Sequence, residues 1–185
     1  MKKFFVRKSH LAFTSLVLVS CILLQQPASA SPFGQGVFGA DVPFGSLTSM
    51  SIALGGNVSL NLSPSGGNFT GTGSHTVTVT SNDVVGYRLY LYSPSGTAMT
   101  NGSYTIPASA NSTPAALATN SWGYNTDGTS NFVGIRATPS IIKDANGPYK
   151  SGDNTTITYG ALTDITKGAG AYTVSVVYTA VSKSQ

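Results

Sequence analysis

Strict alternation of apolar and polar residues is the feature that most constrains the fold of this chain. Residues 57–62, 75–80 and 87–92 place apolar side chains at every second position, with mostly Ser, Thr, Asn or Tyr between them. Successive side chains of a strand point to opposite faces, so this pattern indicates strands with one buried face and one wetter face. We expect Val77, Val79, Tyr87, Leu89 and Leu91 to face the core.

Further strands are expected at 51–54, 103–106, 132–137, 155–159 and 171–181, separated by turns rich in Gly, Asn and Ser. No stretch has a convincing helical period, and residues 114–119 would form one helical turn at most. The sequence therefore predicts an all-β fold, an antiparallel β-sandwich of about seven to nine short strands. This domain occupies residues 47–182 and is followed by a short tail, 183–185.

The first thirty residues have the organisation of a secretory signal peptide. Four basic residues precede an apolar run at 11–24, and small residues at 28–30 place a cleavage site between Ala30 and Ser31. Residues 18–21 also fit a lipobox, so lipidation of Cys21 is the alternative to cleavage after Ala30. Either way, we expect the chain to be secreted and to act outside the cell or at its surface. An apolar run of 14 residues is too short for a membrane anchor, so no membrane span is expected in the mature chain.

Loss of the signal peptide changes the charge of the chain. The net charge of +4 equals the four basic residues of 1–8, which leaves six basic residues and six aspartates in 31–185 and a net charge of zero. Without a basic patch, nucleic acid is not an expected partner. A secreted chain with no net charge gains little solubility from repulsion, which favours self-association. Cys21 is the only cysteine, so the mature chain forms no disulfide.

Residues suited to catalysis or metal binding are few. His75 is the only histidine after residue 30, and no nucleophile-elbow, zinc-protease or P-loop motif occurs. We interpret His75 as a residue of a strand edge or turn, and expect neither enzymatic activity nor a cofactor. The stretches 125–131 and 144–147 resemble fragments of calcium loops but lack the bidentate glutamate, so we interpret them as turns. Calcium dependence stays open.

Trp122 is the only tryptophan and allows two interpretations. With Tyr90, Tyr92 and Tyr124 it would form a platform on which sugar rings stack, because these side chains combine an apolar body with a polar tip. Alternatively, Trp122 fills the end of the sandwich core, and Gly123 lets the chain pass closely. The large area that a buried tryptophan removes from water favours the core interpretation.

Residues 31–46 form a linker-like arm ahead of the first strand. The arm carries five large apolar side chains among glycines and prolines: Phe33, Val37, Phe38, Val42 and Phe44. Exposing three phenylalanines to water is unfavourable. We therefore expect the arm to pack, either on its own sandwich or on a neighbouring subunit, for example as an added strand.

Three segments resemble secreted β-sandwich surface modules of Gram-positive and candidate-phylum bacteria. They are the strand entry at 80–91, the Asn-Ser-Trp-Gly-Tyr element at 120–124 and the closing strand pair at 156–180. The similarity covers about residues 47–181 and extends distantly to WxL cell-wall-binding domains, but the Trp-x-Leu motif is absent, so peptidoglycan binding is not implied. The resemblance implies an extracellular β-sandwich for adhesion or surface architecture, without catalytic residues, in which Trp122 fills the core.

Two functions are expected on these grounds. The first is an extracellular structural protein that self-associates into a fibre or a biofilm matrix, with the arm packing on a neighbouring subunit. The alternative is a secreted module that binds carbohydrate or cell wall through exposed aromatic residues. The expected partners are other copies of the chain and, for the alternative, a polysaccharide or another surface protein.

Overall fold

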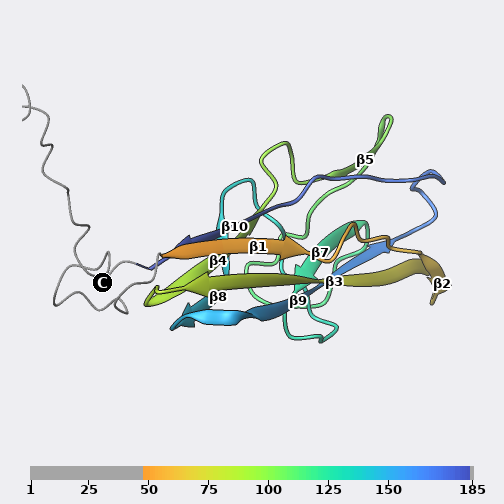
Figure 1. Cartoon of the computed structure of the whole chain (residues 1–185). Helices are drawn as coiled ribbons and strands as arrows, with labels where there is room; N and C mark the ends of the chain where they lie inside the picture. Colours follow the sequence, from red (N-terminus) through yellow and green to blue (C-terminus); the bar gives the residue numbers. More distant parts are fainter. Residues whose placement is uncertain (1–47, 184–185) are drawn as a thin grey trace, which may run out of the picture.

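The computed structural model describes residues 48–183 (Figure 1). The signal peptide, Cys21, the Ala30–Ser31 cleavage site and the arm lie outside these residues. Within the described range the chain forms β-strands and no helix, which confirms the all-β class. The strands are β1 (Ser49–Leu54), β2 (Ser63–Ser65), β3 (Asn68–Asn82), β4 (Gly86–Tyr92), β5 (Met99–Asn101), β6 (Tyr104–Ile106), β7 (Ser121–Asn125), β8 (Ser140–Asn146), β9 (Tyr149–Thr163) and β10 (Val177–Ser182).

The larger sheet has the strand order β1-β3-β9-β7, and β2 also pairs with β3. Its centre is the antiparallel pair β3–β9, in which two strands of 15 residues run side by side from Phe69 opposite Thr163 to Ser81 opposite Tyr149. Because β9 occupies one edge of β3, both β1 and β2 lie along the other edge, at opposite ends of the strand.

The smaller sheet has the order β10-β4-β8, and a separate hairpin is formed by β5 and β6. Strand β4 is therefore paired along both edges, with β10 on one side and β8 on the other. Figure 1 shows the smaller sheet lying against the larger one, with the β5 hairpin projecting beyond them.

The core lies between the two sheets and consists of the side chains that the alternation assigned to the buried face. Val77, Val79, Tyr87, Leu89 and Leu91 are all 0% exposed. They come from the central strands β3 and β4, where the neighbouring strands hold the backbone on both sides. The prediction of a β-sandwich-like fold is confirmed by this arrangement.

The structure also corrects several predicted elements. Residues 132–137 form no strand, because Phe132 pairs with Ala115 and Val133 with Tyr124, and single bridges to two different segments cannot extend into a ladder. Residues 57–62 form no strand either, although their apolar side chains pack against the core. The last strand begins at Val177, later than the predicted 171, and residues 114–119 form no helical turn.

Candidate functional site

Trp122 lies in the core and is the second residue of β7. Its side chain is 0% exposed, its indole N–H donates a hydrogen bond to the Thr97 carbonyl oxygen at 3.0 Å, and its ring lies 6.2 Å from that of Tyr159. Both edges of β7 are paired, since β9 lies on one side and single bridges to Ala108 and Val133 lie on the other. The indole is thus held by packing and by the one hydrogen bond that its N–H needs.

The four aromatic residues proposed as a sugar platform do not share a surface. Tyr124 is only 7% exposed and neighbours Trp122 on β7, so neither ring is available to a ligand, and the platform prediction is wrong for these two. Burial raises the pKa of Tyr124, in agreement with its position in the core. Tyr90 and Tyr92, in contrast, lie on the outer face of the smaller sheet and are partly exposed.

The outer face of β4 carries a row of three side chains: Arg88, Tyr90 and Tyr92. The alternate residues Tyr87, Leu89 and Leu91 are buried in the core, so the row points away from it. The residues opposite the row on β10 are Val181, Thr179 and Val177. On β8, Asp144 lies opposite Arg88, and Ile141, which is 53% exposed, lies opposite Tyr90.

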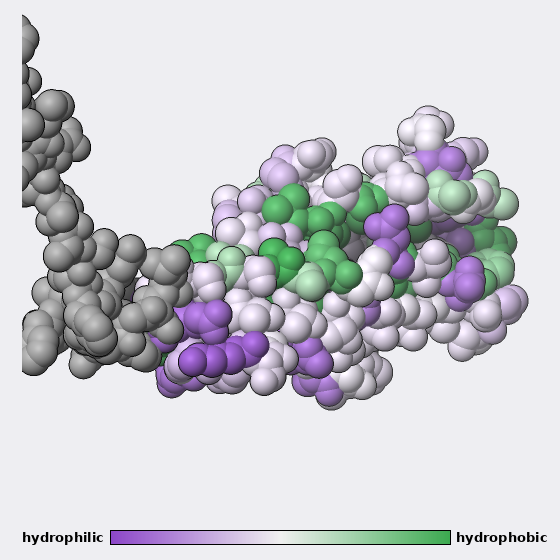
Figure 2. Space-filling model, in the orientation of Figure 1, coloured by the Kyte–Doolittle hydropathy of each residue, from purple (hydrophilic) through white to green (hydrophobic). Residues whose placement is uncertain are grey.

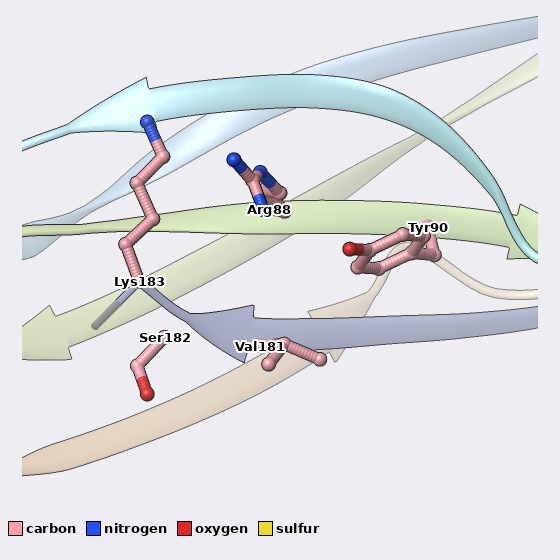
Figure 3. Close-up of a pocket in the computed structure, with 5 residues that line it drawn as sticks. All are labelled: Arg88, Tyr90, Val181, Ser182 and Lys183. Atoms are coloured by element: carbon pink, nitrogen blue, oxygen red, sulfur yellow. The ribbon is translucent and has the colours of Figure 1, made fainter.

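One end of this row borders a surface pocket of about 210 Å³ (Figure 3). The pocket is lined by Arg88, Tyr90, Val181, Ser182 and Lys183. Figure 3 shows the Lys183 side chain extending from the end of β10 towards β8, past Arg88. The pocket brings together residues from 88–90 and 181–183, which are far apart in the sequence, so no local sequence motif predicts it.

Asp144 holds the two basic side chains of the pocket together. Arg88 Nε donates to Asp144 Oδ2 at 3.1 Å, and Lys183 Nζ is paired with Asp144 Oδ1. Hydrogen bonds from Lys183 and then from Arg88 lower the pKa of the Asp144 carboxyl, and the bond to Asp144 raises the pKa of Arg88. The cluster therefore has two positive charges and one negative charge, and it keeps one net positive charge at neutral pH.

His75 occupies the middle of β3, and the prediction that it lies at a strand edge or turn is wrong. Its Nδ1 lies 2.8 Å from the Gly56 carbonyl oxygen and its Nε2 lies 2.6 Å from the Tyr178 hydroxyl, which in turn is hydrogen-bonded to the Tyr159 hydroxyl. Since a carbonyl oxygen can only accept, Nδ1 carries the proton and neutral His75 accepts at Nε2 from Tyr178. A catalytic triad needs these two nitrogens for a serine and a carboxylate, and here both have other partners.

The Asn- and Asp-rich stretches are accounted for by internal contacts. In 125–131, Asn125 accepts from the Gly128 N–H and donates to the Thr129 carbonyl, while Asp127 accepts from the Thr129 N–H. Asp144 belongs to β8 and to the cluster with Arg88. Both carboxylate oxygens of Asp83 are buried without a hydrogen-bond partner, but within residues 48–183 no three His, Cys, Asp or Glu side chains are grouped to hold a metal.

Strand β1 is the free edge of the larger sheet. At the opposite edge, β7 is covered by the segments around Ala108 and Val133, whereas in the described part of the chain β1 pairs only with β3. Ile52 and Leu54 are 38% and 54% exposed, although they share a strand face with Met50, which packs against the core. Figure 2 shows hydrophobic residues gathered over β1 and along the chain that leads into β10.

Comparison of the chain with protein-family models, curated proteins and solved structures found no match. The resemblance to secreted surface modules therefore stays a prediction. Residues 48–183 contain no helix that is long and apolar enough to cross a bilayer.

Proposed function

We propose that this chain is an extracellular structural subunit that self-associates into a fibre or matrix through the free edge of β1. The arm of one subunit, residues 31–46, adds to β1 of the next. The observation that carries this proposal is an edge strand with an exposed apolar face, formed by Ile52 and Leu54. Unpaired backbone groups beside apolar side chains are a template for pairing with another chain.

The energetics favour the arm as the occupant of this edge. Covering the exposed parts of Ile52 and Leu54 contributes about 1.5–3 kcal/mol in total, because the full burial of one such side chain is worth about 1.5–3 kcal/mol and the two exposed parts together amount to about one side chain. Three phenylalanines, each with about 150–250 Å² to bury, contribute more. The arm is the segment of this chain that carries them, at Phe33, Phe38 and Phe44.

The length of the arm also fits. An extended strand rises about 3.3 Å per residue, so the 16 residues of 31–46 span about 50 Å, whereas the six residues of β1 span about 20 Å. An arm that pairs along the whole of β1 keeps about ten residues to connect the two subunits. Each subunit then offers one arm and one edge, and such a head-to-tail contact propagates into an open assembly.

The test uses the predicted mature chain, 31–185, and two variants of it. In the arm variant Phe33, Phe38 and Phe44 are replaced by Ser, and in the edge variant Ile52→Lys and Leu54→Lys place charges on the free edge. We expect the parent chain to form large oligomers or filaments, by negative-stain microscopy and by light scattering after size-exclusion chromatography. Each variant alone is expected to be monomeric. A chain that starts at Leu47 should behave like the arm variant.

Mixing the two variants distinguishes exchange between subunits from packing within one subunit. The arm variant keeps an intact edge and the edge variant keeps an intact arm, so their mixture should form 1:1 dimers that do not grow. Ile165→Lys is the matched control, because Ile165 is 81% exposed in the loop after β9; it should assemble like the parent chain. A monomeric parent, or folded variants that stay monomeric when mixed, would contradict the proposal.

A further inference from the structure

We infer that the outer face of β4 binds an acidic polysaccharide. A sugar carboxylate binds at Arg88 and Lys183, and sugar rings lie against Tyr90 and Tyr92. This site uses β4 of the smaller sheet, whereas the proposed assembly uses β1 of the larger sheet.

The row on β4 is presented on a rigid support. Strand β4 is the central strand of its sheet, and its inward side chains Tyr87, Leu89 and Leu91 are 0% exposed, so the strand cannot rotate or slip without disrupting the core. Fixed elements of this kind hold binding side chains more accurately than loops do. Arg88 and Tyr92 are four residues apart, which places them about 13 Å from each other along the strand. This distance is suited to a short stretch of a linear polymer.

The net positive charge of the cluster favours a negatively charged ligand. Arg88 and Lys183 share one counter-ion, Asp144, and none of the residues that line the pocket is acidic. Arg88 bonds Asp144 through Nε, and a guanidinium has four further N–H donors on its two terminal nitrogens, which match a carboxylate in a bidentate pair. The Arg88 side chain is 49% exposed, so those donors are within reach of a ligand.

The geometry favours a polysaccharide over a peptide. Both edges of β4 are occupied by β10 and β8, so a peptide cannot add to it through backbone hydrogen bonds. What the face offers is two tyrosine rings and a positive charge, which suit the apolar faces and carboxylate of an acidic sugar. The pocket of about 210 Å³ is below the range of about 300–1,000 Å³ that encloses a small molecule, so it suits one group of a longer ligand.

The test is isothermal titration calorimetry of polygalacturonate into residues 31–185, a readout that does not depend on the net charge of the chain, which is zero. The matched neutral polymer is its fully methyl-esterified form, which keeps the sugar backbone and removes the charges. We expect the acidic polymer to bind the chain, and expect methyl esterification, Arg88→Gln or Tyr90→Ala to weaken binding at least tenfold. Tyr90→Phe should stay within about twofold, because it keeps the ring, and higher salt should weaken binding.

Arg136→Gln is the control for charge alone, because Arg136 is exposed and lies outside the pocket. It should bind like the parent, and thermal melts should show that Arg88→Gln and Tyr90→Phe are folded. Equal binding of the methyl-esterified polymer, or equal losses in Arg88→Gln and Arg136→Gln, would overturn the inference. Polyglutamate that binds as tightly, with the same dependence on Arg88, would overturn the assignment to a sugar. For a short oligogalacturonate, which occupies one site at a time, the edge variant should bind like the parent, whether or not the chain assembles.

Discussion

Replacing Trp122 by Ala should destabilise the domain severely, because Trp122 is the largest side chain of the core with no exposed area. The indole packs beside Tyr159 and donates its N–H to the Thr97 carbonyl, so truncation opens a cavity and removes this donor. Truncation of a buried Trp to Ala lowers the free energy of unfolding by about 3–5 kcal/mol. Leaving the Thr97 carbonyl without its hydrogen-bond donor adds about 1 kcal/mol to this loss. We therefore expect Trp122→Ala to lower the free energy of unfolding by about 4–6 kcal/mol.

A loss of this size is a large fraction of the total stability, since domains unfold at about 5–15 kcal/mol. The midpoint of thermal unfolding should fall by about 10–20 °C. Urea unfolding of residues 31–185 measures the change, followed by far-ultraviolet circular dichroism because the substitution removes the only tryptophan fluorophore. Trp122→Phe should lose about half as much, since it keeps one aromatic ring but not the N–H.

Ile165→Ala is the matched control, because Ile165 is 81% exposed and its truncation should change stability by less than about 0.5 kcal/mol. The reasoning would be refuted if Trp122→Ala cost less than about 1 kcal/mol with an unchanged urea dependence. If the same folded variant also lost polysaccharide binding, Trp122 would belong to a recognition surface.

Two further predictions concern the core. Burial raises the pKa of Tyr159 to about 12, and burial first of all also raises the pKa of Tyr178. Because an unfolded tyrosine has a pKa near 10, the stability that these two groups contribute is fully present below about pH 10. It should fall between pH 10 and 12, by up to about 1.4 kcal/mol per pH unit for each such group. Urea unfolding at pH 9 and pH 11 measures this, and Tyr159→Phe should reduce the fall. Gly123→Ala should cost more than about 2 kcal/mol in the same assay, because the new Cβ would lie 2.6 Å from the Val133 carbonyl oxygen. Gly128→Ala, where φ is +70° but the space is open, should cost only about 1 kcal/mol, and equal losses at the two glycines would contradict the close contact.

The two central strands could be predicted because burial leaves a direct trace in the sequence. Val77 and Val79 on β3, and Leu89 and Leu91 on β4, alternate with polar residues, and all four are fully buried. The same alternation wrongly predicted a strand at 57–62. The apolar side chains of this segment do pack against the core, but its backbone does not pair with another strand. Alternation reports which side chains are buried and says nothing of whether a partner strand is present.

Other elements had no readable signal. Strand β8 was missed because Ile141 and Ile142 are adjacent, which breaks the period of two. Leu89 pairs with Lys143 and Tyr90 with Ile141, so Ile142 is the extra residue of a bulge in β8. Strand β7 was missed because its five residues, Ser121–Asn125, are all buried and include only two large apolar side chains, Trp122 and Tyr124, too few to establish a period. Fully buried short strands cannot be recognised by periodicity alone.

The candidate binding row was only half predictable for a related reason. Tyr90 and Tyr92 follow from their outward position on an alternating strand, but the cluster of Arg88, Asp144 and Lys183 depends on strands β8 and β10 pairing with opposite edges of β4. Arg88 and Lys183 are 95 positions apart in the sequence, and only the order of the strands in the sheet brings both of them to Asp144. Trp122 and Tyr124 were grouped with the tyrosines because residue type alone does not distinguish a buried aromatic ring from an exposed one.

The two proposed surfaces are compatible in one molecule, and assembly would strengthen the second. Ile52 and Leu54 lie on β1 of the larger sheet, whereas the row from Arg88 to Tyr92 lies on the outer face of the smaller one, so the two proposed surfaces use different residues. A fibre would then present many weak sites to one polysaccharide chain, and linked sites gain up to about 10²–10⁴-fold in avidity without a new contact. The parent chain should therefore bind polygalacturonate more tightly than the edge variant in a surface-capture assay with immobilised polymer. Per-site affinities for a short oligogalacturonate should be the same in both, and a difference there would mean that β1 and β4 are coupled.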